Sequence, residues 1–123
     1  MNVLVIEDAP TDMKLVSLVL QMSGHIVHGE TSAEQAVKSI KQDKPEVILL
    51  DLNLPGMDGL SLSRLLKADP ETRHIPIVAI TAVPEIFQKE KALAAGCDAY
   101  IIKPIDTRTL SDQVVNAALR KRD

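Results

Sequence analysis

Residues 45–68, PEVILLDLNLPGMDGLSLSRLLKA, decide the fold of this chain. Their first part is an uninterrupted apolar run, 47–50, which ends abruptly at Asp51. Asp58 stands where its carboxylate can accept hydrogen bonds from the first backbone N–H groups of a helix. Helical periodicity follows over 60–68. The stretch therefore predicts a fully buried strand, a loop and a helix.

The same strand and helix order recurs along the whole chain. Apolar runs typical of strands occupy 3–6, 26–28, 47–50, 77–80 and 99–102, and segments with helical periodicity occupy 11–23, 32–42, 60–68, 85–95 and 107–119. Strict alternation implies a parallel sheet covered by helices on both faces. We expect a doubly wound, flavodoxin-like (βα)5 α/β fold: a five-stranded parallel sheet of order 2-1-3-4-5, forming a single domain over residues 1–123.

Periodicity and turn chemistry also predict details of these elements. The apolar residues expected on one stripe of the first helix are Leu15, Leu18, Val19 and Met22. Those expected to face inward from the second helix are Ala36, Val37 and Ile40. Gly24 marks the end of the first helix, and Thr31 or Ser32 can cap the second. Gly56 and Gly59 are interpreted as turn residues.

Composition bounds the class of protein. The chain has 123 residues and a mass of 13.4 kDa, with 46% hydrophobic and 25% charged residues, which is ordinary for a globular domain. Its net charge of −3 provides no basic surface for nucleic acid. No apolar run has the length of a membrane span, and the run 3–6 is not built like a signal peptide. A lone Cys97 suits a reducing compartment and a structural role. We therefore expect a cytoplasmic protein that binds neither nucleic acid nor membrane.

Polar residues follow or end the apolar runs at the same relative place. Glu7 and Asp8 follow the first run, Asp51 the third, Thr81 the fourth and Lys103 the fifth. The carboxyl ends of parallel strands lie at one edge of the sheet, and ligands bind there where the strand order reverses. We expect these five side chains to converge in one acidic crevice with a single cation.

This set of residues suggests phosphoryl chemistry beside a metal ion. Three adjacent carboxylates repel one another unless a cation offsets their charge. Oxygen ligands favour Mg²⁺ over Zn²⁺, and Mn²⁺ could substitute. Asp51 is then a candidate nucleophile that forms an aspartyl phosphate. Lys103 would balance the phosphate charge, and the hydroxyl of Thr81 could bind a phosphoryl oxygen.

The constellation resembles a known family. The matching motifs are Glu7-Asp8, Asp51-x-x-x-Pro55-Gly56-Met57-Asp58-Gly59, Thr81-Ala82 and Lys103-Pro104. Together they resemble the receiver domain of two-component response regulators over essentially the whole chain. The acidic pair is Glu-Asp instead of the commoner Asp-Asp, a change that preserves both charges.

The resemblance implies a role for each matching residue. Asp51 would accept phosphate from a histidine kinase or a histidine phosphotransfer protein. Asp8 would bind Mg²⁺ directly, Glu7 through water, and Asn53 through its backbone carbonyl. The Lys103-Pro104 peptide would be cis.

The resemblance also implies a switch. Thr81 and Tyr100 would move together and change the face formed by the fourth helix, fifth strand and fifth helix, which would bind a downstream protein. The chain would be a signalling phosphoacceptor, not an enzyme. No output segment follows Leu119, so we expect a stand-alone receiver or an excised domain. Val83, two residues after Thr81, is apolar and could shield the phosphoryl group from water, which predicts slow decay of the phosphorylated form.

Three other functions are open at this point. A phosphatase of the haloacid-dehalogenase type would need an Asp-x-Asp after the first run, where this chain has Glu7-Asp8-Ala9. A flavin or nucleotide carrier would need a phosphate-binding loop at the same place. A receiver-like domain that binds partners without phosphate would have the same fold but would not accept a phosphoryl group.

Overall fold

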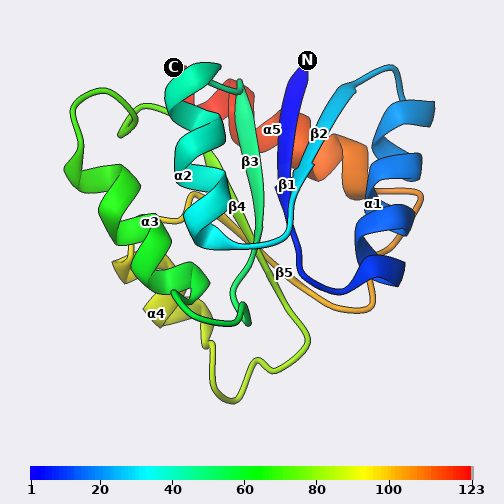
Figure 1. Ribbon diagram of the computed structural model, residues 1–123. Helices are drawn as coiled ribbons and strands as arrows, with labels where there is room; N and C mark the ends of the chain where they lie inside the picture. The colour runs from blue at the N-terminus through cyan, green and yellow to red at the C-terminus, as the bar shows by residue number, and fades with distance from the viewer. Residues whose placement is uncertain (123) are drawn as a thin grey trace.

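The computed structural model describes residues 1–122, with side chains described as far as residue 120. Strands and helices alternate, and the sheet order is β2-β1-β3-β4-β5 with every pair parallel (Figure 1). The strands are β1 (Asn2–Ile6), β2 (Ile26–Glu30), β3 (Val47–Asp51), β4 (Ile77–Thr81) and β5 (Ala99–Ile102). The helices are α1 (Pro10–Met22), α2 (Ala33–Gln42), α3 (Gly59–Ala68), α4 (Lys89–Ala94) and α5 (Leu110–Arg122). The predicted fold class and strand order are confirmed.

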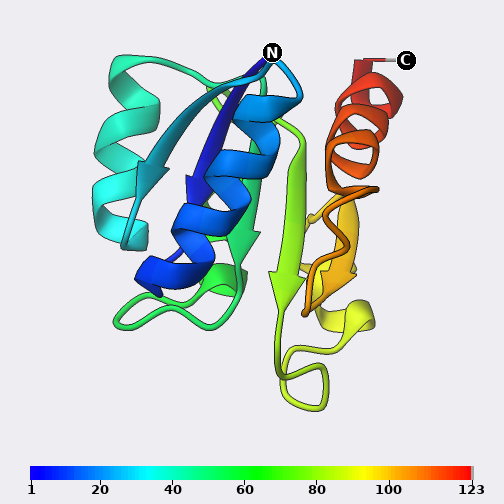
Figure 2. The same ribbon diagram turned by 90° about the vertical axis from the view of Figure 1, so that its right-hand side faces the viewer.

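Helices cover both faces of the sheet, as Figures 1 and 2 show. Helices α2, α3 and α4 enclose one apolar core, and α1 and α5 enclose the other. Successive residues of a strand point to opposite faces, so Leu4 and Ile6 enter the first core while Val3 and Val5 enter the second. Within residues 1–122, no helix is long and apolar enough to cross a membrane.

The predicted caps and the face of α2 are confirmed. Ser32 Oγ accepts a hydrogen bond of 3.1 Å from the backbone N–H of Gln35, and Asp58 Oδ1 accepts one of 2.8 Å from that of Ser61. Each satisfies one of the free donors at a helix N-terminus. Helix α2 buries Ala36 and Ile40 and partly buries Val37.

Three of the four residues on the predicted apolar stripe of α1 are exposed. Leu15, Leu18 and Met22 are 42%, 52% and 79% exposed. The helix instead buries Val16 and Leu20, and partly buries Met13 and Val19. Apolar residues lie around most of this helix, so periodicity alone supports more than one stripe. Packing against β1, β2 and α5 selects the stripe that is buried.

The last two helices begin later than predicted. Helix α4 starts at Lys89 because the backbone N–H groups of Ile86 and Phe87 both donate to the Val83 carbonyl, closing a separate turn. Gln88 then has an extended backbone, with φ −68° and ψ 152°. Helix α5 starts at Leu110, after a turn over residues 107–109.

The strand register brings the polar strand ends to one level. Ile6 of β1 pairs with Leu50 of β3, so the residues that follow them, Glu7 and Asp51, are neighbours. Thr81 of β4 pairs with Ile102 of β5, and the backbone N–H of Lys103 donates to the Thr81 carbonyl at 2.8 Å. The fold therefore delivers these side chains to the same edge of the sheet.

Candidate functional site

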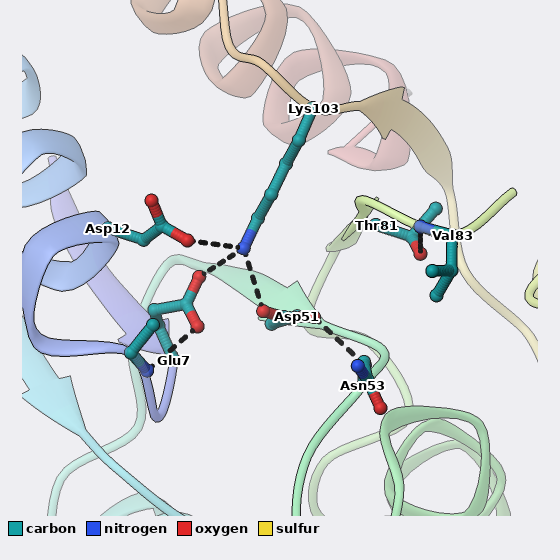
Figure 3. Close-up of polar contacts among 8 residues, drawn as sticks. Glu7, Asp12, Asp51, Asn53, Thr81, Val83 and Lys103 are labelled. Carbon is teal, nitrogen blue, oxygen red and sulfur yellow. Dashed lines mark hydrogen bonds and ion pairs between the residues drawn. The ribbon is translucent and has the colours of Figure 1, made fainter.

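One ammonium group binds three carboxylates at the carboxyl edge of the sheet. Lys103 Nζ donates to Glu7 Oε1 at 2.7 Å, to Asp51 Oδ2 at 2.9 Å and to Asp12 Oδ2 at 2.9 Å. Figure 3 shows the lysine side chain reaching down between the three acids, which come from different parts of the chain. Three of these four residues were predicted to converge, and the structure brings them into direct contact.

Backbone N–H groups hold two of the carboxylates in place. Glu7 and Asp51 are only 3% and 4% exposed. Glu7 Oε2 accepts from the backbone N–H of Ala9 at 3.2 Å, and Asp51 Oδ1 accepts from that of Asn53 at 2.9 Å. These bonds fix one oxygen of each side chain. The second oxygen of each contacts Lys103.

Burial and crowding shift two pKa values at this site. Burial, and after it the neighbouring Asp51, raises the pKa of Glu7 from 4.5 to about 7, and the hydrogen bond from Lys103 offsets only part of this rise. Burial lowers the pKa of Lys103, but hydrogen bonds to Glu7, Asp51 and Asp12 outweigh this effect and leave it above its ordinary value. The lysine therefore stays charged, while Glu7 is poised to gain or lose a proton near neutral pH.

A hard cation fits beside Asp51. One carboxylate oxygen from each of Glu7, Asp8 and Asp51 lies within 4.8 Å of the others. Asp8 is exposed, whereas the other two side chains are buried, so the cluster opens to solvent on one side. Oxygen donors with room for water are the ligand set that Mg²⁺ prefers. The acidic cluster that the sequence predicted is therefore suited to this metal.

Asp12 is the member of the site that the sequence analysis missed. It lies in the first turn of α1, four residues after Asp8, and its side chain is 43% exposed. The signal that could have found it is its place on the helix that begins at the carboxyl edge. An acid in a first turn is ordinarily explained by the helix dipole, so the sequence alone did not single it out.

Thr81 and Tyr100 occupy the adjoining strands. Thr81 is fully buried, and its Oγ1 accepts from the backbone N–H of Val83 at 3.0 Å. In Figure 3 this pair lies apart from the group around Lys103. The Tyr100 hydroxyl donates to the Phe87 carbonyl, in the segment that joins β4 to α4. The Lys103-Pro104 peptide is cis, as predicted.

Cys97 is buried away from this site. Its thiol donates to Ser63 Oγ at 3.4 Å, and the Ser63 hydroxyl donates to the Ala95 carbonyl at 2.8 Å. Burial raises the pKa of the Cys97 thiol, which keeps it neutral and unreactive. These contacts agree with the structural role predicted for it.

The raised pKa of Glu7 makes the stability of the metal-free protein depend on pH. The folded protein retains a proton at Glu7 that the unfolded chain releases, since the folded pKa of about 7 exceeds the ordinary 4.5. This contribution to the free energy of unfolding is intact below about pH 4.5 and is lost as the pH rises to about 7. Glu7→Gln cannot ionise, so between these pH values it should gain about 3 kcal/mol relative to the wild type.

Urea unfolding in EDTA at a series of pH values measures this difference. A difference between the two proteins that stays constant from about pH 4.5 to about pH 7 would contradict the prediction.

Comparisons with known proteins agree with this geometry. The family described as the response regulator receiver domain matches residues 3–115. The chain is 36% identical over 104 residues to the polar-differentiation response regulator DivK of Brucella abortus, covering 85% of both chains.

Solved structures are similar across nearly the whole fold. A putative response regulator from Chloroflexus aurantiacus has a TM-score of 0.92 and 31% identity, with 97% of this chain and 98% of that chain covered. The receiver domain of a sensor histidine kinase from Pseudomonas aeruginosa has a TM-score of 0.87 and 30% identity, with 95% and 96% covered. That structure has a magnesium ion coordinated in its active site cleft.

Proposed function

This chain belongs to the response regulator receiver domain family, and from that premise we propose that residues 1–123 act as one phosphoacceptor domain whose acceptor is Asp51. The observation that carries the proposal is the setting of the Asp51 carboxylate. Lys103 Nζ and the Asn53 backbone N–H each bind one of its oxygens, and Glu7 and Asp8 supply oxygens beside it. The phosphoryl donor would be a histidine kinase or a histidine phosphotransfer protein.

The proposed site would also hold a divalent ion. We assign Asp8, Asp51, the Asn53 backbone carbonyl and Glu7 as its ligands, with Glu7 acting through water. When bound, Mg²⁺, or Mn²⁺ in its place, offsets the negative charge of phosphoryl transfer. The three clustered carboxylates support this assignment because they carry more charge than Lys103 alone balances.

The transfer step is a displacement at phosphorus. One Asp51 carboxylate oxygen forms a bond to phosphorus while the bond between phosphorus and the donor nitrogen breaks, and the departing imidazole keeps the electron pair. Lys103 donates a hydrogen bond to a phosphoryl oxygen and balances part of its charge. The chain thus takes part in its own phosphorylation as a signalling protein.

Thr81 and Tyr100 would transmit the phosphorylation state. In the structure the Thr81 hydroxyl oxygen is engaged by Val83 N–H, and the Tyr100 hydroxyl by the Phe87 carbonyl. Rotation of Thr81 toward a phosphoryl oxygen would release the first contact and alter the segment that carries the second. The output surface would be the α4–β5–α5 face, which exposes three large apolar side chains for a downstream protein in the cytoplasm: Leu93, Ile102 and Leu119.

Acetyl phosphate tests the proposed function directly. The protein is incubated with acetyl phosphate and Mg²⁺, and intact mass is recorded together with peptide mapping. One added phosphoryl group on Asp51 is the expected result, and it should be absent when EDTA is present throughout the incubation and absent in Asp51→Ala. A domain that binds partners without phosphate would gain no mass under any of these conditions.

The apolar side chain of Val83 should slow the decay of the phosphorylated form. Its side chain is half-buried beside Thr81, where an apolar group excludes water. Val83→Glu places a hydrated carboxylate there, so hydrolysis of the aspartyl phosphate should accelerate about tenfold. The decay of phosphorylated protein, followed by intact mass after removal of acetyl phosphate, measures the half-life, with Val83→Ile as the apolar control. Equal half-lives for Val83→Glu and the wild type would show that the Val83 side chain does not shield the phosphoryl group from water.

A further inference from the structure

Lys103 has no free N–H group in the structure. An ammonium carries three donors, and those of Lys103 go to Glu7, Asp12 and Asp51. A phosphoryl oxygen can therefore bind Lys103 only by replacing one of these carboxylates. The contact to Asp51 gives way when Asp51 is phosphorylated, and the proposed function leaves open whether the contact to Glu7 or to Asp12 yields a second N–H group.

The three carboxylates differ in how readily they release the lysine. The Glu7 side chain is 4% exposed, and a buried carboxylate that loses its cation is left poorly solvated. Asp51 loses its charge when its oxygen bonds to phosphorus, so the N–H that it accepts from can turn to the phosphoryl group that Asp51 then carries. The Asp12 side chain is 43% exposed and lies outside the cluster suited to a metal ion. Water can solvate Asp12 once Lys103 leaves it, so the contact to Asp12 costs less to break than the contact to Glu7.

We propose that Asp12 is a positioning residue that holds Lys103 in the unphosphorylated state and competes with the phosphoryl group for its third N–H. The proposal rests on the proposed function and adds to it a residue that limits phosphoryl affinity. Asp12 also places a negative charge near the incoming phosphoryl oxygens. Both effects act in the same direction, and removal of the charge should favour the phosphorylated state.

A titration with beryllium fluoride, a phosphoryl mimic, in excess Mg²⁺ tests the competition. Asp12→Asn keeps the shape of the side chain and removes its charge, and we expect it to bind about fivefold more tightly than the wild type, the scale of one partly exposed ion pair. Asp12→Glu restores the charge and should return the affinity to near the wild-type value. Asp43→Asn removes an equal charge after α2, at the opposite edge of the sheet, and should leave affinity unchanged.

A metal-free measurement tests the resting contact itself. In EDTA, the ¹⁵N-correlated resonance of the Lys103 ammonium should be visible in the wild type, because three hydrogen bonds slow its exchange with water. In Asp12→Asn the same resonance should shift and broaden. A cooperative urea unfolding transition should show that this variant is still folded. A purely structural role for Asp12 would not produce this signature.

The two proposals fail in different ways. Wild-type protein that neither binds beryllium fluoride nor gains mass from acetyl phosphate would overturn the proposed function. The role of Asp12 alone would be overturned if the wild type does both and Asp12→Asn has the same affinity for beryllium fluoride or the same Lys103 resonance.

Discussion

Replacement of Asp51 by asparagine is expected to abolish phosphoryl acceptance and, in the same protein, to raise the free energy of unfolding of the metal-free state. The amide oxygen can still accept from the Asn53 backbone N–H, which holds Asp51 Oδ1 at 2.9 Å. The neutral amide cannot act as the nucleophile. It also removes one buried negative charge from a cluster in which Glu7 and Asp8 remain.

The stabilising effect follows from the contacts that remain. Lys103 keeps Glu7 and Asp12 as partners after the substitution. Asp51 is a cause of the raised pKa of Glu7, so its loss should bring that pKa down toward its ordinary value. We expect a gain of about 1 kcal/mol at neutral pH, since relief of carboxylate repulsion outweighs the loss of one of three contacts to Lys103.

Two measurements on Asp51→Asn check this pair of effects. Intact mass after incubation with acetyl phosphate should show no phosphoryl group, and urea unfolding in EDTA should show a higher midpoint than the wild type. Asp43→Asn is the matched control for the removal of one charge, and its midpoint should not rise. A phosphorylated Asp51→Asn protein would place the acceptor elsewhere, and a lower midpoint would mean that the contact with Lys103 dominates.

The strand ends were predictable because a parallel sheet imposes simple geometry. Glu7, Asp51 and Lys103 each interrupt or follow an apolar run, and in-register parallel strands carry such residues to one edge. The caps at Ser32 and Asp58 were predictable for a similar reason, because each satisfies backbone donors within three residues along the chain. Short-range chemistry and strand order therefore account for most of the site.

The errors arose where contacts between distant elements decide the outcome. The face that α1 buries depends on how it packs against β2 and α5, and its sequence offers apolar residues on several sides. The start of α4 is a local exception: the Val83 carbonyl closes a turn three and four residues along the chain, and this turn outweighs helical periodicity. Asp12 enters the site only because α1 begins beside the end of β5, where Lys103 stands.

Gly59 was interpreted as a turn residue, and that interpretation is wrong. It is the first residue of α3, and its backbone N–H donates to the Leu52 carbonyl at 3.1 Å. A Cβ atom at this position would lie 2.6 Å from Leu52 Cα and 2.8 Å from the Asp51 carbonyl oxygen. The start of α3 thus packs directly on the backbone that follows β3, which is the backbone that carries Asp51.

Gly59→Ala is expected to lower the free energy of unfolding by about 3 kcal/mol, because the added carbon meets backbone atoms that cannot rotate away. Gly24→Ala is the matched control: no atom lies within 4 Å of its Cβ, and only its φ of +91° opposes the change, which predicts a loss of about 1 kcal/mol. Urea unfolding compares the two. The folded fraction of Gly59→Ala should also accept phosphate from acetyl phosphate more slowly, since relief of the clash must displace the Asp51–Leu52 backbone. Equal destabilisation by both alanines would show that helix α3 can retreat from β3 at little cost, and that Gly59 does not set the position of the acceptor.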